Sequence, residues 1–243
     1  MTTHARTTHA ASPGPVLPAP AVLLFDLDGV LADVSRSYRR AILETAAALG
    51  VVVDAEQVRA AKAAGNANND WELTWRLLTA AGVQISLAEV TARFEALYQG
   101  SAAAPGLRQT ESLLVAPAWL EQLAALLPLG VVTGRPRRDA ERFLEQHGVA
   151  GAFRTLVCME DAPAKPDPAP VRLALRALGA TRAWLVGDTP DDMRAALAAG
   201  VVPVGIAAPG DDPLRAAQTL REAGAAWVLQ QLGELTTMLA AAD

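Results

Sequence analysis

The strongest constraint on the fold is a series of short apolar segments that end in polar residues or glycine. The first, AVLLFDLD at 21–28, runs without interruption into two aspartates. Continuous apolar runs of this length are typical of strands buried on both faces of a parallel sheet. Later segments of the same character predict five more strands, at 129–133, 153–159, 183–188, 201–206 and, as a short one, near 226–230.

Helical patterns separate these later segments. Their apolar residues recur at helical spacing, and a glycine follows the last of them at Gly148, Gly179 and Gly200, where helices commonly end. Strands that alternate with helices predict an α/β fold with a doubly wound, Rossmann-like parallel sheet. We assign residues 21–33 and 113–243 to this core.

Residues 34–112 interrupt the alternation, because they carry helical signals and no strand signal. The candidate helices are 35–49, 54–64, 70–81 and 86–98. We therefore expect a small, all-helical cap domain inserted after the first strand. It follows the carboxyl end of that strand, where ligands bind in open α/β sheets, and would serve as a lid.

The remaining sequence features limit location and partners. Residues 1–20 are small, polar and proline-rich, which predicts a disordered tail without the apolar region of a signal peptide. A single cysteine, Cys158, excludes an internal disulfide and favours a cytoplasmic protein. The net charge of −5 argues against nucleic-acid binding, and no apolar run approaches the ~18 residues of a membrane span. The sequence leaves the oligomeric state open.

Scarce residue types restrict the chemistry. Two of the three histidines lie within the first ten residues, so a catalytic metal would be held by oxygen ligands, which favours Mg²⁺ over zinc. Lysine is also rare: Lys62 and Lys165 are the only two among 21 basic residues. A lysine within a charged cluster is therefore expected to serve the chemistry.

Four local motifs lie at the carboxyl ends of predicted strands. They are FDLDGV at 25–30, VVTGR at 131–135, KPDP at 165–168 and VGDTPDD at 186–192. In this order and spacing they resemble the motifs of the haloacid dehalogenase-like superfamily, in particular its phosphoglycolate-phosphatase-like members with a helical cap. The resemblance covers the chain from about Ala21 to its end, and it implies a Mg²⁺-dependent phosphatase.

The resemblance gives the first motif the central roles. It implies that Asp26 attacks phosphorus and forms an aspartyl-phosphate, which divides a difficult hydrolysis into two steps. Asp28 would protonate the leaving oxygen and then activate water, and strand alternation would place both carboxylates on one face. Relatives that cleave C–halogen or C–P bonds lack the second aspartate, so Asp28 favours phosphate esters. An ordinary strand-end turn is the alternative for Asp26.

The second and third motifs would hold the phosphoryl group. A hydroxyl at Thr133 and free N–H groups around Gly134 suit its oxygens, although a simple helix N-terminus is the alternative. Lys165 would offset the charge beside Asp26, although a solvated loop lysine is the usual alternative.

The resemblance implies a metal site made of Asp26, the Asp28 carbonyl, Asp188 and, directly or through water, Asp192. Asp192 also fits a capping box that starts at Thr189, and both roles are compatible. Four carboxylates exceed the single charge of Lys165, so an anionic substrate would be repelled unless a divalent cation is bound.

Weaker signals concern substrate binding. Arg135 follows the second motif and is a candidate contact for phosphate or substrate. Arg36 opens the cap together with Arg39 and Arg40, although such a run often forms a solvated helix face. The polar turn Gly65–Asp70 could read the substrate through Asn69, which fits a helix N-cap equally well. We take Asp191 as a first-turn charge.

The sequence therefore predicts a phosphatase for a small organic phosphate monoester, in which the cap selects the substrate. The compound itself stays open; phosphoglycolate and biosynthetic intermediates such as histidinol phosphate are both compatible. A phosphomutase of the same fold and a non-catalytic binding protein on this scaffold are the alternatives.

Overall fold

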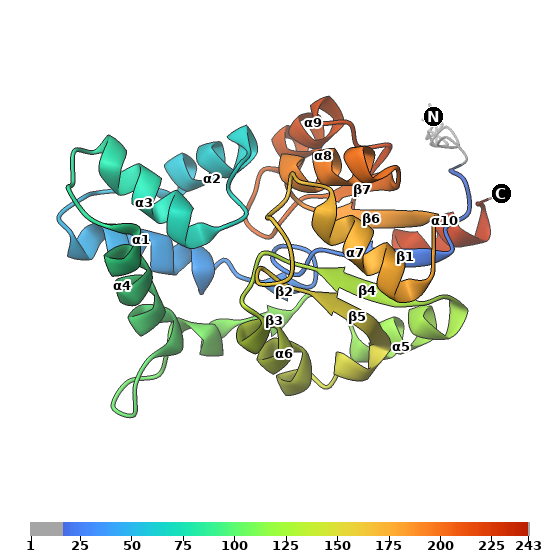
Figure 1. Ribbon diagram of the computed structural model, residues 1–243, viewed down its shortest axis with the longest axis horizontal. Coiled ribbons are helices and arrows are strands. Elements are labelled where there is room, and N and C mark those ends of the chain that lie inside the picture. The colour runs from blue at the N-terminus through green and yellow to red at the C-terminus, as the bar shows by residue number, and fades with distance from the viewer. Residues whose placement is uncertain (1–16, 243) are drawn as a thin grey trace, which may run out of the picture.

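A computed structural model describes residues 17–242, in which a parallel sheet lies beside a group of helices (Figure 1). Most of the predicted disordered tail, residues 1–16, lies outside the described residues. Leu17 packs against the core, and the carbonyl of Pro18 accepts a hydrogen bond from Trp184 Nε1 at 3.0 Å. No helix of the described part is long and apolar enough to cross a membrane.

The main sheet confirms the predicted α/β class. All its strand pairs are parallel, and the order is β5-β4-β1-β6-β7-β8. The strands match the six predicted ones: β1 Val22–Phe25, β4 Leu129–Val132, β5 Phe153–Val157, β6 Ala183–Gly187, β7 Val202–Ile206 and β8 Trp227–Leu229. The order reverses at β1, so the crevice at the ends of β1, β4 and β6 is the expected place for a ligand.

Successive residues of β1 pack into different parts of the core. Leu23 and Phe25 belong to the cluster that includes Leu120, Phe143 and Leu235, whereas Val22 and Leu24 belong to the cluster that includes Val171 and Ala195. Because both faces are covered, every residue of this central strand is buried and apolar. The core helices are α5 Pro117–Leu126, α6 Arg137–Gln146, α7 Ala169–Leu178, α8 Pro190–Ala199, α9 Pro213–Glu222 and α10 Glu234–Ala240.

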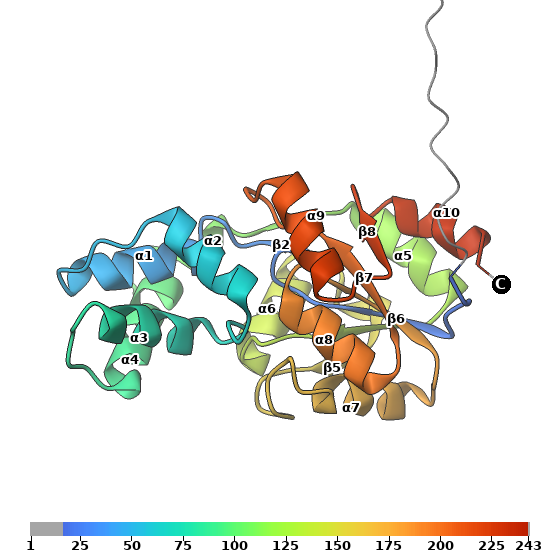
Figure 2. The same ribbon diagram turned by 90° about the horizontal axis from the view of Figure 1, so that it is seen from above.

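Four helices form the cap, and they match the predicted segments. They are α1 Tyr38–Ala48, α2 Ala55–Ala64, α3 Asp70–Ala80 and α4 Leu87–Gln99. Side chains cap three of them: Asp54 begins α2 with a capping box, Asn69 begins α3 and Ser86 begins α4. Viewed from above, the four helices form a group beside the sheet (Figure 2).

The connection between cap and sheet contains structure that the sequence did not predict. Ala32–Asp33 (β2) pairs antiparallel with Ser112–Leu113 (β3), and a 3₁₀ turn, η1, covers Leu107–Thr110. The expectation that residues 34–112 contain no strand was therefore wrong at Ser112, where β3 begins, whereas β2 lies just before this segment. Strands of two residues are too short to show an alternating pattern. We also did not predict α9 and α10.

Candidate active site

The ends of three neighbouring strands bring the motif residues together. Asp26 follows β1, Thr133 follows β4 and Asp188 follows β6. Lys165 comes from the loop after β5 and is buried. Its Nζ lies 2.8 Å from Asp26 Oδ1, 2.5 Å from Asp192 Oδ1 and 3.0 Å from the Val132 carbonyl oxygen. One ammonium group therefore joins the first and fourth motifs.

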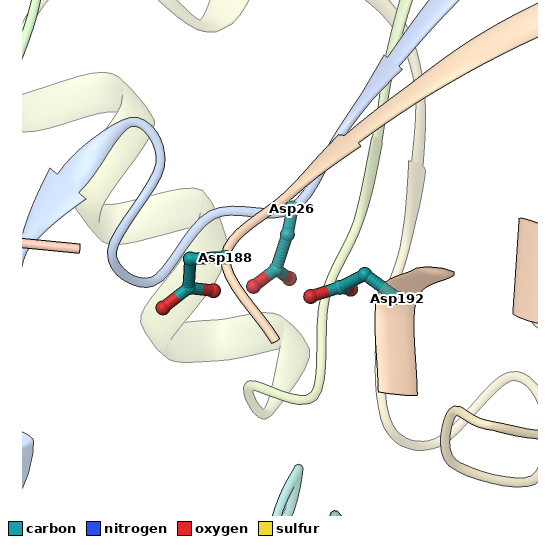
Figure 3. Close-up of side chains that lie close together, drawn as sticks. All are labelled: Asp26, Asp188 and Asp192. Carbon is teal, nitrogen blue, oxygen red and sulfur yellow. The ribbon is translucent and has the colours of Figure 1, made fainter. Parts of the chain in front are cut away.

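Three carboxylates gather beside this lysine. One oxygen each from Asp26, Asp188 and Asp192 lies within 4.8 Å of the others (Figure 3). Asp188 Oδ1 is buried and has no hydrogen-bond partner among the described residues. Burial leaves such an oxygen costly unless a cation or donor approaches it. The donor set is made of hard oxygens, which fits Mg²⁺.

Burial and mutual repulsion control the charges of this cluster. Burial, and to a lesser degree Asp192 and Asp28, raises the pKa of Asp26 to about 7, although Lys165 lowers it. Burial next to Asp26 and Asp192 also raises the pKa of Asp188. Burial lowers the pKa of Lys165, but Asp192 and Asp26 outweigh it and raise the pKa above its usual range. The site is therefore short of positive charge.

Asp192 has the helix-capping role that its motif allows. Its Oδ2 accepts hydrogen bonds from the Thr189 N–H at 3.0 Å and the Thr189 hydroxyl at 2.6 Å, while Oδ1 contacts Lys165. Direct metal ligation would have to compete with these bonds, so the water-mediated role is the easier one. Asp192 nevertheless lies in the carboxylate cluster.

The Asp28 carboxylate is not part of the cluster of three carboxylates. The strand ends at Phe25, so strand alternation does not extend to the two aspartates. Both line one small cavity of about 30 Å³, but the Asp28 carboxylate pairs with Arg135 at 2.5 Å. Gly29 turns the chain at φ +78°, and a Cβ there would collide with the Asp188 carboxylate.

Thr133 and Gly134 lie where the second motif predicts. Thr133 is buried, and its Oγ1 accepts a hydrogen bond from the Arg135 N–H at 3.1 Å. Gly134 lines the small cavity and lies directly against Asn68 of the cap, so close that a Cβ would collide with it. Glycine is therefore required for the cap to approach here.

Two predicted substrate contacts need correction. Arg135 is 1 % exposed and pairs with Asp28 and Glu111, so it is not free to bind substrate. Both acidic partners of Arg135 lie far from it in the sequence, and no sequence pattern marks Glu111 as a site residue. Arg36 is exposed and does not line the small cavity, whereas Arg39, which pairs with Asp211, does.

The polar cap turn Gly65–Asp70 contacts the core, but through residues other than Asn69, which we had expected to bind substrate. Asn69 caps α3 by accepting hydrogen bonds from the N–H groups of Trp71 and Glu72. Asp191, which we took as a first-turn charge, accepts hydrogen bonds from the Asn66 and Ala67 N–H groups at 3.0 and 3.1 Å. This turn therefore closes over the site.

Lys62, the second lysine, also reaches the site from the cap. It pairs with Asp70 at 2.8 Å and lines the small cavity with Arg39 and Asp188. The same three residues line a larger cavity of about 260 Å³ between α2 and α9. The two cavities are thus adjacent, and together they offer space for a small organic molecule beside the carboxylates.

Comparisons with known proteins identify the family of the chain. A family model described as haloacid dehalogenase-like hydrolase matches residues 20–200. A Phytophthora nicotianae protein named imidazoleglycerol-phosphate dehydratase is 45 % identical, over 90 % of this chain and 52 % of its own length. This chain thus spans about half of that relative.

Two further matches cover most of both chains. A phosphoglycolate phosphatase of Yersinia pseudotuberculosis is 32 % identical, over 75 % of this chain and 78 % of its own. The crystal structure of a hydrolase from Pseudomonas syringae superimposes with a TM-score of 0.71 at 22 % identity, over 92 % of this chain and 100 % of the other. At that identity the structural match supports the fold alone.

Proposed function

The chain belongs to the haloacid dehalogenase-like hydrolases, and we propose that it is a Mg²⁺-dependent phosphatase that cleaves small organic phosphate monoesters. One observation carries the proposal: Lys165 Nζ donates a hydrogen bond to Asp26 Oδ1 at 2.8 Å, and Asp26 belongs to a group of three buried or half-buried carboxylates. A binding protein gains nothing from burying these like charges together. A phosphoryl-transfer site needs them for a nucleophile and a cation.

In the proposed reaction Asp26 is the nucleophile. One of its carboxylate oxygens forms a bond to phosphorus while the ester P–O bond breaks, and the leaving oxygen takes a proton from Asp28. Asp28 then accepts a proton from water as the water oxygen bonds to phosphorus and the P–O bond to Asp26 breaks. Inorganic phosphate departs and both aspartates return to their starting states.

Lys165 and the second motif hold the phosphoryl group in this proposal. Lys165 Nζ already contacts Asp26 and would offset the charge that accumulates as the phosphoryl oxygens arrive. Thr133 Oγ1 and the N–H of Gly134 lie at the end of the neighbouring strand and would donate to those oxygens. The closed cap keeps bulk water from the aspartyl-phosphate.

Asp26, Asp188 and the Asp28 carbonyl would hold Mg²⁺, with Asp192 nearby. The unpartnered Asp188 Oδ1 is the observation that fits a cation at this position. When bound, the ion would neutralise the phosphate and polarise the phosphoryl oxygen. A substrate dianion would otherwise meet a site that is short of positive charge.

The substrate is a compound that fits the cavities under the cap. The 260 Å³ cavity has apolar walls at Ala60, Ala63 and Leu220 and charged groups at Arg39 and Lys62, which suits a small, partly polar leaving group. The names of two relatives refer to phosphoglycolate and to imidazoleglycerol phosphate. Both compounds, and histidinol phosphate, therefore belong among the candidates.

A panel assay tests the function. Purified protein with Mg²⁺ is incubated with these three esters, sugar phosphates and p-nitrophenyl phosphate, and inorganic phosphate is measured. We expect phosphate release without a bisphosphate activator. Release only with such an activator would indicate the phosphomutase, and no release from any ester would favour the binding protein. A cytoplasmic location is part of the same proposal.

A further inference from the structure

Arg135 lies buried between the candidate acid/base and the cap. Its side chain is 0 % exposed and pairs with Asp28 at 2.5 Å and with Glu111 at 2.9 Å. The guanidinium carbon lies 5.0 Å from the ring centre of Tyr38 and 5.1 Å from that of Phe143. Two carboxylates and two rings thus fix the plane of the guanidinium group.

Glu111 connects this arginine to the base of the cap. It precedes β3, and its Oε1 accepts hydrogen bonds from the Ser37 hydroxyl at 2.7 Å and the Tyr98 hydroxyl at 3.1 Å. Ser37 precedes α1 and Tyr98 lies in the last turn of α4, so these contacts join both ends of the cap. The series of contacts Asp28–Arg135–Glu111 therefore connects the small cavity to the residues that begin and end the cap.

Asp28 depends on this arginine for its position. It lies in the turn after β1, its side chain is 26 % exposed, and Arg135 is the only side chain of the described residues that hydrogen-bonds its carboxylate. A carboxylate on a turn would otherwise sample several rotamers. A displacement of about 1 Å can cost a catalytic group about 100-fold in rate.

We propose that Arg135 is a positioning residue that holds the Asp28 carboxylate in place, and that Glu111 holds Arg135 for this task. The inference rests on the proposed function. It replaces the expected contact of Arg135 with substrate. Substitution of Arg135 should slow only the two proton transfers that use Asp28. Attack by Asp26 on an ester whose leaving group needs no proton should continue.

Leaving-group dependence separates these steps. Arg135→Met is mixed rapidly with p-nitrophenyl phosphate, whose leaving group departs without an acid, and with the best alkyl phosphate of the panel. We expect a burst of about one p-nitrophenol per active site followed by slow turnover. For the alkyl phosphate we expect kcat to fall at least ~100-fold, the lower range for general acid–base catalysis, with KM nearly unchanged. Asp28→Asn serves as the reference and should show the same pattern.

A double variant separates positioning from folding. Arg135→Met alone leaves Glu111 buried without its partner, which destabilises the protein. Arg135→Met combined with Glu111→Gln removes that charge, so thermal stability should return toward the wild-type value. The alkyl phosphate defect should persist in the double variant.

Four outcomes decide between the explanations. Recovery of alkyl phosphate turnover in the double variant would overturn the inference, as would equal slowing of both esters without a burst. A burst with a persistent alkyl phosphate defect supports it. If the wild-type protein releases no phosphate from any ester, the proposed function fails first and the inference fails with it.

Discussion

Lys165 Nζ donates a hydrogen bond to Asp26 Oδ1 at 2.8 Å, and this contact orients the carboxylate that we propose as the nucleophile. The lysine is buried and has the backbone carbonyl of Val132 as a further acceptor, so its ammonium group has little freedom. Asp26 thereby keeps one oxygen hydrogen-bonded to Lys165, and in the proposed reaction the other oxygen attacks phosphorus. The reaction should depend on this carboxylate above all other groups.

Asp26→Asn should abolish turnover while the fold survives. An amide cannot attack phosphorus, and loss of a nucleophile elsewhere costs ~10⁶ in rate. Phosphate release is measured with the best substrate, and the thermal midpoint reports the fold. Asp54→Asn is a matched control, because Asp54 caps an exposed helix of the cap and asparagine also serves as an N-cap. A tenth of wild-type activity in Asp26→Asn would contradict the covalent mechanism.

Chelation should remove activity, and Mg²⁺ should restore it. The carboxylates of Asp26, Asp188 and Asp192 repel a phosphate dianion unless a cation offsets them. Ca²⁺ should not restore activity, because it prefers more ligands and longer bonds than Mg²⁺. Initial rates after EDTA treatment and titration with each ion test this expectation. Full activity in chelator would rule out the metal site.

The metal-free protein should lose stability as the pH rises from about 4 to about 7. The folded state raises the pKa of Asp26 from 3.8 to about 7, so it binds a proton more tightly than the unfolded state in this range. A state that binds more protons loses free energy of stabilisation as the pH rises. Asp188, whose pKa is also raised, acts in the same direction.

Denaturant unfolding in EDTA at several pH values measures this effect. The free energy of unfolding of Asp26→Asn should fall less steeply than that of the wild type, because the Asp26 contribution is absent. Mg²⁺ should stabilise the wild type most at the upper end of the range, where the carboxylates are free to bind it. Parallel curves for the two proteins would contradict the raised pKa of Asp26.

The sheet was predictable from sequence because its signals are local. Val22–Phe25 is buried on both faces, so its apolar run identifies a central parallel strand without knowledge of its neighbours. The ordered motifs likewise predicted where Asp26, Thr133 and Asp188 belong, because parallel strands place their carboxyl ends at one edge. The pairing of Lys165 with Asp26 was predictable because a positive side chain was expected to offset the clustered carboxylates.

The contacts between cap and core were not predictable in this way. The Glu111–Arg135 pair and the hydrogen bonds from Asn66 and Ala67 to Asp191 join residues far apart in the sequence. No local pattern distinguishes Glu111 from a solvated glutamate or Asp191 from a helix-terminal charge. Such roles depend on which surfaces meet after folding, and sequence periodicity does not encode them.

Asn68→Ala tests whether the closed cap turn reads the substrate. Asn68 lies against Gly134 and lines the small cavity with Asp26 and Asp28, so its amide faces a substrate bound there. We expect at least a tenfold loss, about 1.4 kcal/mol, in kcat/KM for the best substrate of the panel. Hydrolysis of p-nitrophenyl phosphate, which lacks a matching polar end, should change little.

Asn69→Ala is the control for Asn68→Ala. It removes the N-cap of α3, costs about 1 kcal/mol of stability, and should not discriminate between the two substrates. Equal losses on both substrates with Asn68→Ala would instead mean that the turn only closes the site, and specificity would then be read by Arg39 or Lys62 in the larger cavity.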